Sequence, residues 1–391
     1  MSELEFGDGF IWGASTAAHQ VEGNNVSSDW WRREQAGDAA ISEPSGDAAD
    51  SYHRFAEDIR ILASLGLRMY RFSVEWARIE PERGAYSKAE LFHYMRMIAC
   101  CRENNVVPMI TLHHFTNPHW FTEAGGWLAD DAIECFERYI DFLRPLLGMA
   151  EWVCTINEPN MVAMTHVRDD RELTAGPMRE PDGEISERLV IAHRRCREHL
   201  TEFPSIRSGW AVATQAFHAV PGAEREMKEY EYPRENFFLE AGEGDDFLGV
   251  QAYLRTFIGK EGPLPVPEGA ETTLTGWEYF PEALELGVRN AWSCSKGTPI
   301  FVTENGIATA NDQRRIDYTS TALAGLHKCI QDGIKVFGYL HWSLLDNYEW
   351  GSYRPTFGLV SWDPSTFERR IKRSGEWFGS VARRGVLQFP A

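Results

Sequence analysis

Short apolar runs alternate with longer stretches of helical periodicity eight times along this chain, which leaves few folds open to it. The runs are rich in β-branched and aromatic residues, and the stretches between them space apolar residues along one face of a helix. Eight strand–helix repeats within 391 residues predict a closed (β/α)8 TIM barrel of the α/β class. The expected strands are residues 10–14, 68–74, 106–112, 152–156, 208–213, 247–251, 300–303 and 336–342.

The intervals between the runs favour one domain over several. No Ser/Gly-rich or Pro-rich tract separates two globular blocks, so residues 1–391 are expected to form a single domain. A doubly wound open sheet is the alternative, but no GxGxxG motif follows the first run. Helices are expected at 49–65, 88–104, 130–147, 187–203, 281–295, 313–332 and 366–383, with the least clear helix after the fifth run, and loops at 169–184 and 259–276.

Charge and cysteine content limit the partners and the compartment. The formal net charge is −19, from 39 basic and 58 acidic residues, which argues against nucleic acid or an anionic membrane as a main partner. No stretch reaches 18 apolar residues, and the N-terminus lacks the pattern of a signal peptide. The seven cysteines are scattered without a CxxC pair, so we expect reduced thiols in a cytoplasmic protein. The oligomeric state cannot be read from the sequence.

Polar and aromatic residues follow the apolar runs, where a barrel would place its active site. The carboxyl ends of all strands meet at one face of a TIM barrel, and chemistry belongs there. A structural protein has little reason to gather so many polar groups at strand ends, because burying them is costly. These residues are Gln20, Glu22, Arg71, Glu75, His113, His114, Asn157, Glu158, Gln251, Tyr253, Glu304, Asn305, His341, Trp342, Glu349 and Trp350.

Two carboxylates stand out because each directly follows a buried-looking run. Glu158 follows the fourth run and Glu304 the seventh, so a barrel places them on opposite sides of its mouth. A pair of carboxyl groups across a cleft is the equipment for cleaving a glycosidic bond, with one held protonated and the other ionised. The alternative is that each glutamate pairs with an arginine in a structural network.

Other residues also have a structural interpretation. Arg71 could form a buried ion pair with Glu75, and Trp342 could be a core residue. The histidines at 113, 114 and 119 raise the idea of a metal, but no HxH follows the first strand and no carboxylate completes a ligand set, so no metal is expected. Four tryptophans lie within expected strands or just after one and are assigned to the core: Trp12, Trp76, Trp152 and Trp210. Such residues account for part of the aromatic content, which is 13%.

Six motifs in order along the chain resemble glycoside hydrolase family 1, the β-glucosidase family. They span residues 10–23, 70–79, 155–159 (Thr-Ile-Asn-Glu-Pro), 303–306 (Thr-Glu-Asn-Gly), 342–350 (Trp-Ser-Leu-Leu-Asp-Asn-Tyr-Glu-Trp) and 357–359. The resemblance implies a retaining exo-β-glycosidase that acts on terminal β-linked sugars of a small glycoside or oligosaccharide, with no metal or organic cofactor. The open alternatives are a transglycosylase and a catalytically silent sugar-binding barrel.

The resemblance also implies a role for each matching residue. Glu158 resembles the general acid/base and Glu304 the nucleophile, while Asn157 would hydrogen-bond the sugar 2-hydroxyl. Arg71 and Tyr253 resemble the residues that hold the nucleophile ionised and oriented. Residues that resemble the sugar-binding groups are Gln20, His114, Glu349 and Trp350, with Trp342 as a platform beneath the sugar.

Several features depart from the family pattern or refine it. The chain is short between Glu158 and Glu304, which predicts a more open aglycone side. Gln251 stands where Asn is usual, so hydrogen bonding near the nucleophile is in question.

The intact Glu349-Trp350 pair favours a neutral sugar over a phosphorylated one, and the acid/base glutamate favours O-glycosides over thioglucosides. Glucose, galactose, fucose and xylose are not distinguished. Further departures are His19 for Tyr, Phe115 for Trp and Thr116 for Asp.

Overall fold

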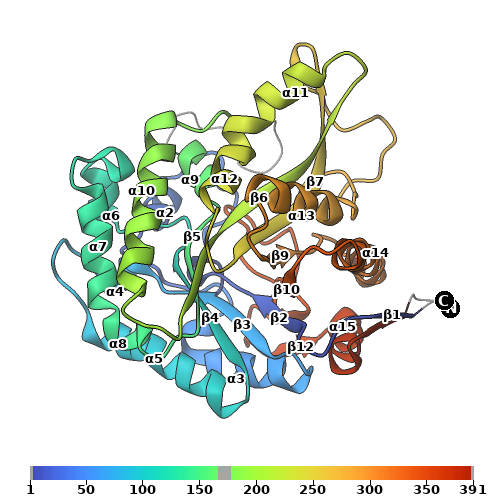
Figure 1. The fold of residues 1–391 in the computed structure, drawn as a ribbon. Coiled ribbons are helices and arrows are strands. Elements are labelled where there is room, and N and C mark those ends of the chain that lie inside the picture. Colours follow the sequence, from blue (N-terminus) through green and yellow to red (C-terminus); the bar gives the residue numbers. More distant parts are fainter. Residues whose placement is uncertain (1–2, 166–177, 389–391) are drawn as a thin grey trace.

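The computed structural model describes residues 3–165 and 178–388, which form a single closed barrel domain (Figure 1). Its strands pair in the order β6-β5-β4-β3-β2-β10-β9-β7, and the pairing of β6 with β7 closes the ring. All eight pairings are parallel, so the predicted (β/α)8 barrel is confirmed and the open sheet is excluded. The strands are β2 (Ile11–Ser15), β3 (Met69–Ser73), β4 (Val107–His113), β5 (Trp152–Asn157), β6 (Arg207–Ala219), β7 (Leu248–Gly259), β9 (Ile300–Asn305) and β10 (Val336–Trp342).

Helices surround the barrel as the periodicity predicts (Figure 1). The long ones are α3 (Ser51–Ser64), α5 (Lys88–Glu103), α7 (Ala132–Phe142), α10 (Gly183–Leu200), α13 (Ala283–Cys294), α14 (Asp312–Gln331) and α15 (Arg373–Arg384). The interval after β6 holds α11 (Glu224–Glu231), a π-helical turn (Tyr232–Asn236) and α12 (Phe237–Ala241). Shorter elements are α1 (Ala18–Val21), α2 (Asp29–Gln35), α4 (Trp76–Ile79), α6 (His119–Glu123), a 3-10 turn (Gly126–Leu128), α8 (Arg144–Leu147), α9 (Pro159–Thr165), β1 (Glu3–Glu5), β8 (Gly262–Pro263), β11 (Val360–Trp362), β12 (Arg369–Ile371) and β13 (Val386–Gln388).

Two helix predictions need correction. The helix expected at 130–147 divides into α7 and α8, because Pro145 lies at the start of α8 and has no N–H to continue the helix before it. The helix expected at 366–383 begins only at Arg373, since β11 and β12 first form an antiparallel hairpin. The Asp363 carboxylate fixes that hairpin by accepting backbone N–H groups of its own turn.

The barrel interior below the mouth is filled by aromatic and aliphatic side chains. The Trp152 ring lies 5.2–5.6 Å from the rings of Phe247, Phe301 and Phe337. The four tryptophans assigned to the core are at most 5% exposed, which confirms that assignment. Much of the aromatic content is therefore packing, and the barrel is a filled scaffold that carries its site on one rim.

Strands β6 and β7 extend past the barrel mouth, as Figure 1 shows beside α11. They contain 13 and 12 residues, and their pairing continues to Ala219 and Ile258. The predicted strands at 208–213 and 247–251 were correct in place but too short. The predicted loop at 259–276 starts on the last residue of β7, contains the two residues of β8 and is otherwise irregular. The loop predicted at 169–184 lies mostly outside the described residues, and α10 already begins at Gly183.

Two global features complete the description of the fold. All seven cysteines lie in the described part of the chain and are free thiols. In residues 3–165 and 178–388, no helix has the length and apolar character needed to cross a membrane. The cytoplasmic location stays a prediction.

Candidate active site

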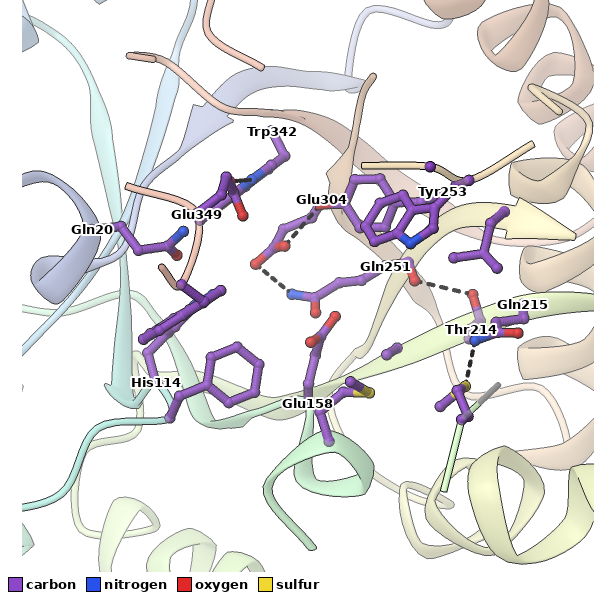
Figure 2. Close-up of a pocket in the computed structure, with 18 of the residues that line it drawn as sticks. Gln20, His114, Glu158, Thr214, Gln215, Gln251, Tyr253, Glu304, Trp342 and Glu349 are labelled. Atoms are coloured by element: carbon purple, nitrogen blue, oxygen red, sulfur yellow. Dashed lines mark hydrogen bonds between the residues drawn. The ribbon is translucent and has the colours of Figure 1, made fainter. Parts of the chain in front are cut away.

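A cavity of about 1380 Å³ opens at the carboxyl ends of the barrel strands. Arg71 and Asn157 are fully buried beneath it. Figure 2 shows Glu158 and Glu304 in the middle of the cavity, with Gln20, Glu349 and Trp342 to one side. The structure thus gathers all ten candidate residues at one place. Eight of them line the cavity: Gln20, His114, Glu158, Tyr253, Glu304, Trp342, Glu349 and Trp350.

Glu304, at the end of β9, is held by three donors from neighbouring strands. Arg71 Nη1 on β3 donates to Oε1 over 2.5 Å, and Gln251 Nε2 on β7 donates to the same oxygen over 2.8 Å. The Tyr253 hydroxyl donates to Oε2 over 2.9 Å. Three donors on one carboxylate fix its orientation and favour its ionised form.

Arg71 does not pair with Glu75, the alternative that the sequence left open. Its Nη2 donates to Asn157 Oδ1 over 2.5 Å and its Nε to Thr111 Oγ1 over 3.0 Å. Glu75 instead accepts a hydrogen bond of 2.8 Å from the Thr116 hydroxyl. Arg71 therefore lies beneath the cavity and positions Glu304 and Asn157 by hydrogen bonds to both.

Glu158 faces the same cavity, but the Arg71 guanidinium bonds to Glu304, and in residues 3–165 and 178–388 no cation forms an ion pair with Glu158. Burial raises the pKa of Glu158 well above the ordinary range, and the nearby Glu304 carboxylate adds to the rise. Burial raises the pKa of Glu304 as well, but there the Arg71 guanidinium and the Tyr253 hydroxyl oppose it. Glu304 is consequently the stronger acid, so the pair holds one proton on Glu158 and a negative charge on Glu304.

The backbone aims Glu158 into the cavity at the turn from β5 into α9. Glu158 adopts a left-handed conformation with φ of 44°, which costs on the order of 1 kcal/mol for a residue other than glycine. Its N–H donates to the Ala211 carbonyl over 2.7 Å, and the Asn160 side chain donates to the Ala213 and Arg234 carbonyls over 2.9 and 2.8 Å. These bonds to β6 and the π-helical turn hold the strained turn in place.

Polar and aromatic groups form the other end of the cavity. Trp342 Nε1 donates to Glu349 Oε1 over 3.1 Å, and burial raises the pKa of Glu349 to about 8. Gln20 Nε2 donates to the Tyr348 carbonyl over 2.9 Å, while its buried Oε1 has no protein partner in the described part of the chain. The His114 ring lies nearly parallel to the Trp342 ring at 6.0 Å. Unpaired acceptors beside flat rings suit a hydroxylated ring with an apolar face.

The departures from the family pattern have clear places in the site. Gln251 donates to Asn157 Oδ1 and Glu304 Oε1, both over 2.8 Å, so the hydrogen bonding questioned from the sequence is intact. His19 contacts Glu34 over 3.1 Å, and its ring lies parallel to that of Trp350. Phe115 lies edge-on to Trp350 at 5.0 Å.

Sequence reasoning missed several parts of the site. The supporting role of Gln251 is one, and its position at a strand end was the available signal. The cavity-lining positions of Trp277 and Phe357 are others, although Phe357 begins the family motif at 357–359, which was the available signal. For metals, residues 3–165 and 178–388 contain no cluster of three or more His, Cys, Asp or Glu suited to hold an ion.

Comparison with known proteins identifies the family. The model of glycosyl hydrolase family 1 matches residues 2–193 and 260–386, which is most of the chain. This chain belongs to glycosyl hydrolase family 1. It is a glycosidase of the O-glycoside-cleaving class, and the resemblance inferred from its motifs is confirmed. The segment 194–259, which contains β6 and β7, lies outside the match.

Relatives of this glycosidase share its whole length. Beta-glucosidase A of Acetivibrio thermocellus is 29% identical over 453 aligned residues, covering 98% of this chain and 99% of the relative. A 6-phospho-beta-galactosidase of Lacticaseibacillus casei is 26% identical, covering 97% and 98%. The crystal structure of beta-glycosidase BGL167 superposes with a TM-score of 0.90 at 41% identity, covering 97% of each chain. A Thermotoga maritima beta-glucosidase in complex with deoxynojirimycin has a TM-score of 0.88 at 26% identity, covering 98% and 99%.

Proposed function

We propose that this family 1 glycosidase is a retaining exo-β-glycosidase that releases a terminal β-glucosyl residue. The observation that carries the proposal is the unequal surroundings of the two carboxyl groups. Glu304 accepts three hydrogen bonds, one of them from the Arg71 cation, whereas Glu158 is buried with a strongly raised pKa. One ionised and one protonated carboxyl group are what double displacement at a sugar carbon requires.

The roles follow from that difference. Glu304 attacks the anomeric carbon while Glu158 gives its proton to the departing glycosidic oxygen, leaving a covalent glycosyl-enzyme. Glu158, now ionised, removes a proton from water, which attacks the anomeric carbon and releases Glu304. Asn157, which Arg71 and Gln251 position, would hydrogen-bond the sugar 2-hydroxyl. Substrate hydroxyl groups would meet Gln20, His114, Glu349 and Trp350, with Trp342 beneath the ring.

A neutral sugar is proposed over a phosphorylated one, although relatives include a 6-phospho-beta-galactosidase. Glu349 is a buried acid at the sugar end, held by Trp342 Nε1. A carboxyl group whose pKa burial raises to about 8 offers a phosphate group no cation to pair with, whereas its oxygens can hydrogen-bond to sugar hydroxyls. The curated relatives named beta-glucosidase favour glucose and favour hydrolysis over transfer to another acceptor.

The test is a panel of 4-nitrophenyl β-glycosides followed by analysis of the first product. We expect the highest kcat/KM for the glucoside among the glucoside, galactoside, fucoside, xyloside and 6-phosphoglucoside. Proton NMR during the first turnovers should show the β-anomer of the sugar, and the two carboxyl groups should lie about 5–5.5 Å apart in a crystal structure. Release of the α-anomer, or turnover of the phosphorylated substrate alone, contradicts the proposal.

A further inference from the structure

One part of the outer wall of the cavity is largely apolar. This wall consists of the β7 residues 254–257 and the loop 263–267, whose sequence is Pro-Leu-Pro-Val-Pro. Leu264 and Val266 on that loop are 44% and 37% exposed, and both line the same cavity as Glu158 and Glu304. Exposed large apolar side chains that line a binding cavity mark a surface that an apolar ligand covers.

The wall offers few free hydrogen-bonding groups. Its three prolines have no N–H, and the Leu264 N–H is used by the Phe257 carbonyl over 2.8 Å. Arg255 is paired, since its Nε donates to Glu278 Oε2 over 2.9 Å and its guanidinium lies 4.5 Å from the Phe257 ring centroid. A sugar hydroxyl placed here would lose hydrogen bonds to water without replacing them, which is costly.

The wall lies on the leaving-group side of the catalytic pair. Figure 2 shows Thr214 and Gln215 of β6 on the opposite side of Glu304 from Gln20 and Glu349. Gln215 accepts a hydrogen bond of 2.6 Å from Thr256, so the two overhanging strands form one surface. The cavity of about 1380 Å³ exceeds the roughly 300–1,000 Å³ that encloses a drug-sized ligand, so there is room beyond one sugar ring.

We propose that this wall binds a large apolar aglycone, a long-chain or fused-ring alcohol, in preference to a second sugar. The proposal rests on the function proposed above, because an aglycone is defined only for a glycoside cleaved by Glu158 and Glu304. In such a substrate the glycosidic oxygen lies at Glu158, and the carbon skeleton attached to that oxygen extends along Leu264 and Val266.

A series of n-alkyl β-glucosides tests the proposal, because from ethyl to octyl the leaving alcohols have nearly equal acidity and differ in apolar length. Each methylene that becomes fully buried should raise kcat/KM roughly fourfold. We expect a rise of about 30-fold or more from ethyl to octyl glucoside, measured below the micelle concentration. Cellobiose should be a poorer substrate than octyl glucoside. Equal kcat/KM across the series, or a preference for cellobiose, overturns the proposal that the wall binds an apolar aglycone.

A double variant locates the effect. Leu264→Ser with Val266→Ser should reduce the octyl-to-ethyl ratio of kcat/KM by about tenfold. Leu286→Ser is the matched control, because Leu286 is 38% exposed on α13 and does not line the cavity, and it should leave the ratio unchanged. An unchanged ratio in the double variant overturns the assignment of the wall to these residues.

Calorimetry with the non-hydrolysable n-octyl 1-thio-β-D-glucoside separates the two proposals. Tighter binding of the octyl than of the ethyl thioglucoside, lost in the double variant, supports the wall even if turnover is slow. Failure of every aryl β-glycoside to turn over contradicts the proposed function. Turnover of aryl glucosides without any dependence on alkyl length contradicts only the wall.

Discussion

The two halves of β7 face one cavity but differ in chemistry. The inner half provides Gln251 and Tyr253, which donate hydrogen bonds to the buried Glu304 carboxylate. The outer half, residues 254–257, provides part of the apolar wall, where the Arg255 and Glu278 charges pair with each other. A buried charge accepts only particular partners at particular distances, whereas an apolar wall needs only shape. The inner half is therefore expected to determine the reaction and the outer half the choice of substrate.

Among the substitutions that test this difference between the two halves of β7, the one at Glu304 should have the largest effect on activity. Glu304→Gln should lower kcat on 4-nitrophenyl β-glucoside by about 10⁴-fold or more, because the amide cannot attack the anomeric carbon. Glu278→Gln changes the carboxylate that pairs with Arg255 of the wall and should cost at most about tenfold, since the amide still accepts from Arg255. Steady-state kinetics on both proteins, with circular dichroism to confirm folding, make the comparison. Similar losses in the two variants contradict the division between reaction and wall.

Glu158 should show a loss that depends on the leaving group and on pH. Glu158→Ala should lower kcat/KM by about 10²–10⁴-fold for glycosides with poor leaving groups, and azide should restore turnover with a β-glycosyl azide as product. Because burial raises the pKa of Glu158, its proton is present at neutral pH and is lost as pH rises through that pKa. The alkaline fall of kcat/KM in the wild type should therefore be absent from the variant. A variant that keeps the alkaline fall argues against this acid.

A smaller effect is expected from the support around the nucleophile. Gln251→Leu removes the two hydrogen bonds of 2.8 Å to Asn157 and Glu304, and should lower kcat/KM by roughly 10–100-fold, as expected for bonds to a charged group. Gln251→Asn should lose less, because the amide is kept. Thr256→Val, farther out on the same strand, should change kcat/KM by about threefold at most. If Gln251→Leu has no larger effect than Thr256→Val, the inner half of β7 does not support Glu304.

The smallest effect, on stability, concerns Glu235, which anchors the part of β6 that extends past the barrel mouth. Glu235, in the π-helical turn, accepts the Gln215 N–H over 2.8 Å and the Asn290 amide over 2.9 Å, and burial raises its pKa to about 8. The folded protein therefore binds a proton here that the unfolded chain, with a glutamate pKa of about 4.3, has released, so stability should fall as pH rises from about 5 to 8.

Thermal unfolding checks this anchor. In Glu235→Gln the fall in Tm between pH 5 and pH 8 should be smaller than in the wild type by a few degrees, on the order of 2–4 °C. A part of the fall should remain, because burial also raises the pKa of Glu349 to about 8. Glu240→Gln, at an exposed position of α12, is the control and should match the wild type. If Tm falls equally between pH 5 and pH 8 in Glu235→Gln and in the wild type, Glu235 does not bind the proton assigned to it.

The barrel and its catalytic floor could be predicted from the sequence because both follow from local patterns. Apolar runs such as 300–303 must be buried, and a TIM barrel brings the ends of its parallel strands together. Polar residues directly after such runs, among them Glu158 and Glu304, therefore converge on one cavity whatever the details of packing. Motifs of the family then assigned each residue a role.

The outer wall could not be predicted in the same way. Beyond residue 213, the buried positions of β6 are Thr214 and Ala216 and the half-buried ones include Gln215 and Phe217, so the sequence shows no apolar–polar alternation that would mark this extension of the strand. The Gln251 contacts depend on how deeply its side chain reaches between Asn157 and Glu304, which is a matter of three-dimensional packing. The hairpin of β11 and β12 depends on a turn fixed by Asp363, a local hydrogen-bonding effect that outweighs helical periodicity.

The central claim, that Glu304 is the nucleophile of a retaining mechanism, can be tested by trapping the intermediate. 2-Deoxy-2-fluoro-β-D-glucosyl fluoride should react with the enzyme because fluoride leaves readily, while the 2-fluoro group slows the second step. Mass spectrometry should show one fluoroglucosyl group per chain, on the peptide that contains Glu304 and on the Glu304 side chain itself. A label on another carboxylate, or an enzyme that turns over natural glucosides yet cannot be labelled, would contradict the account.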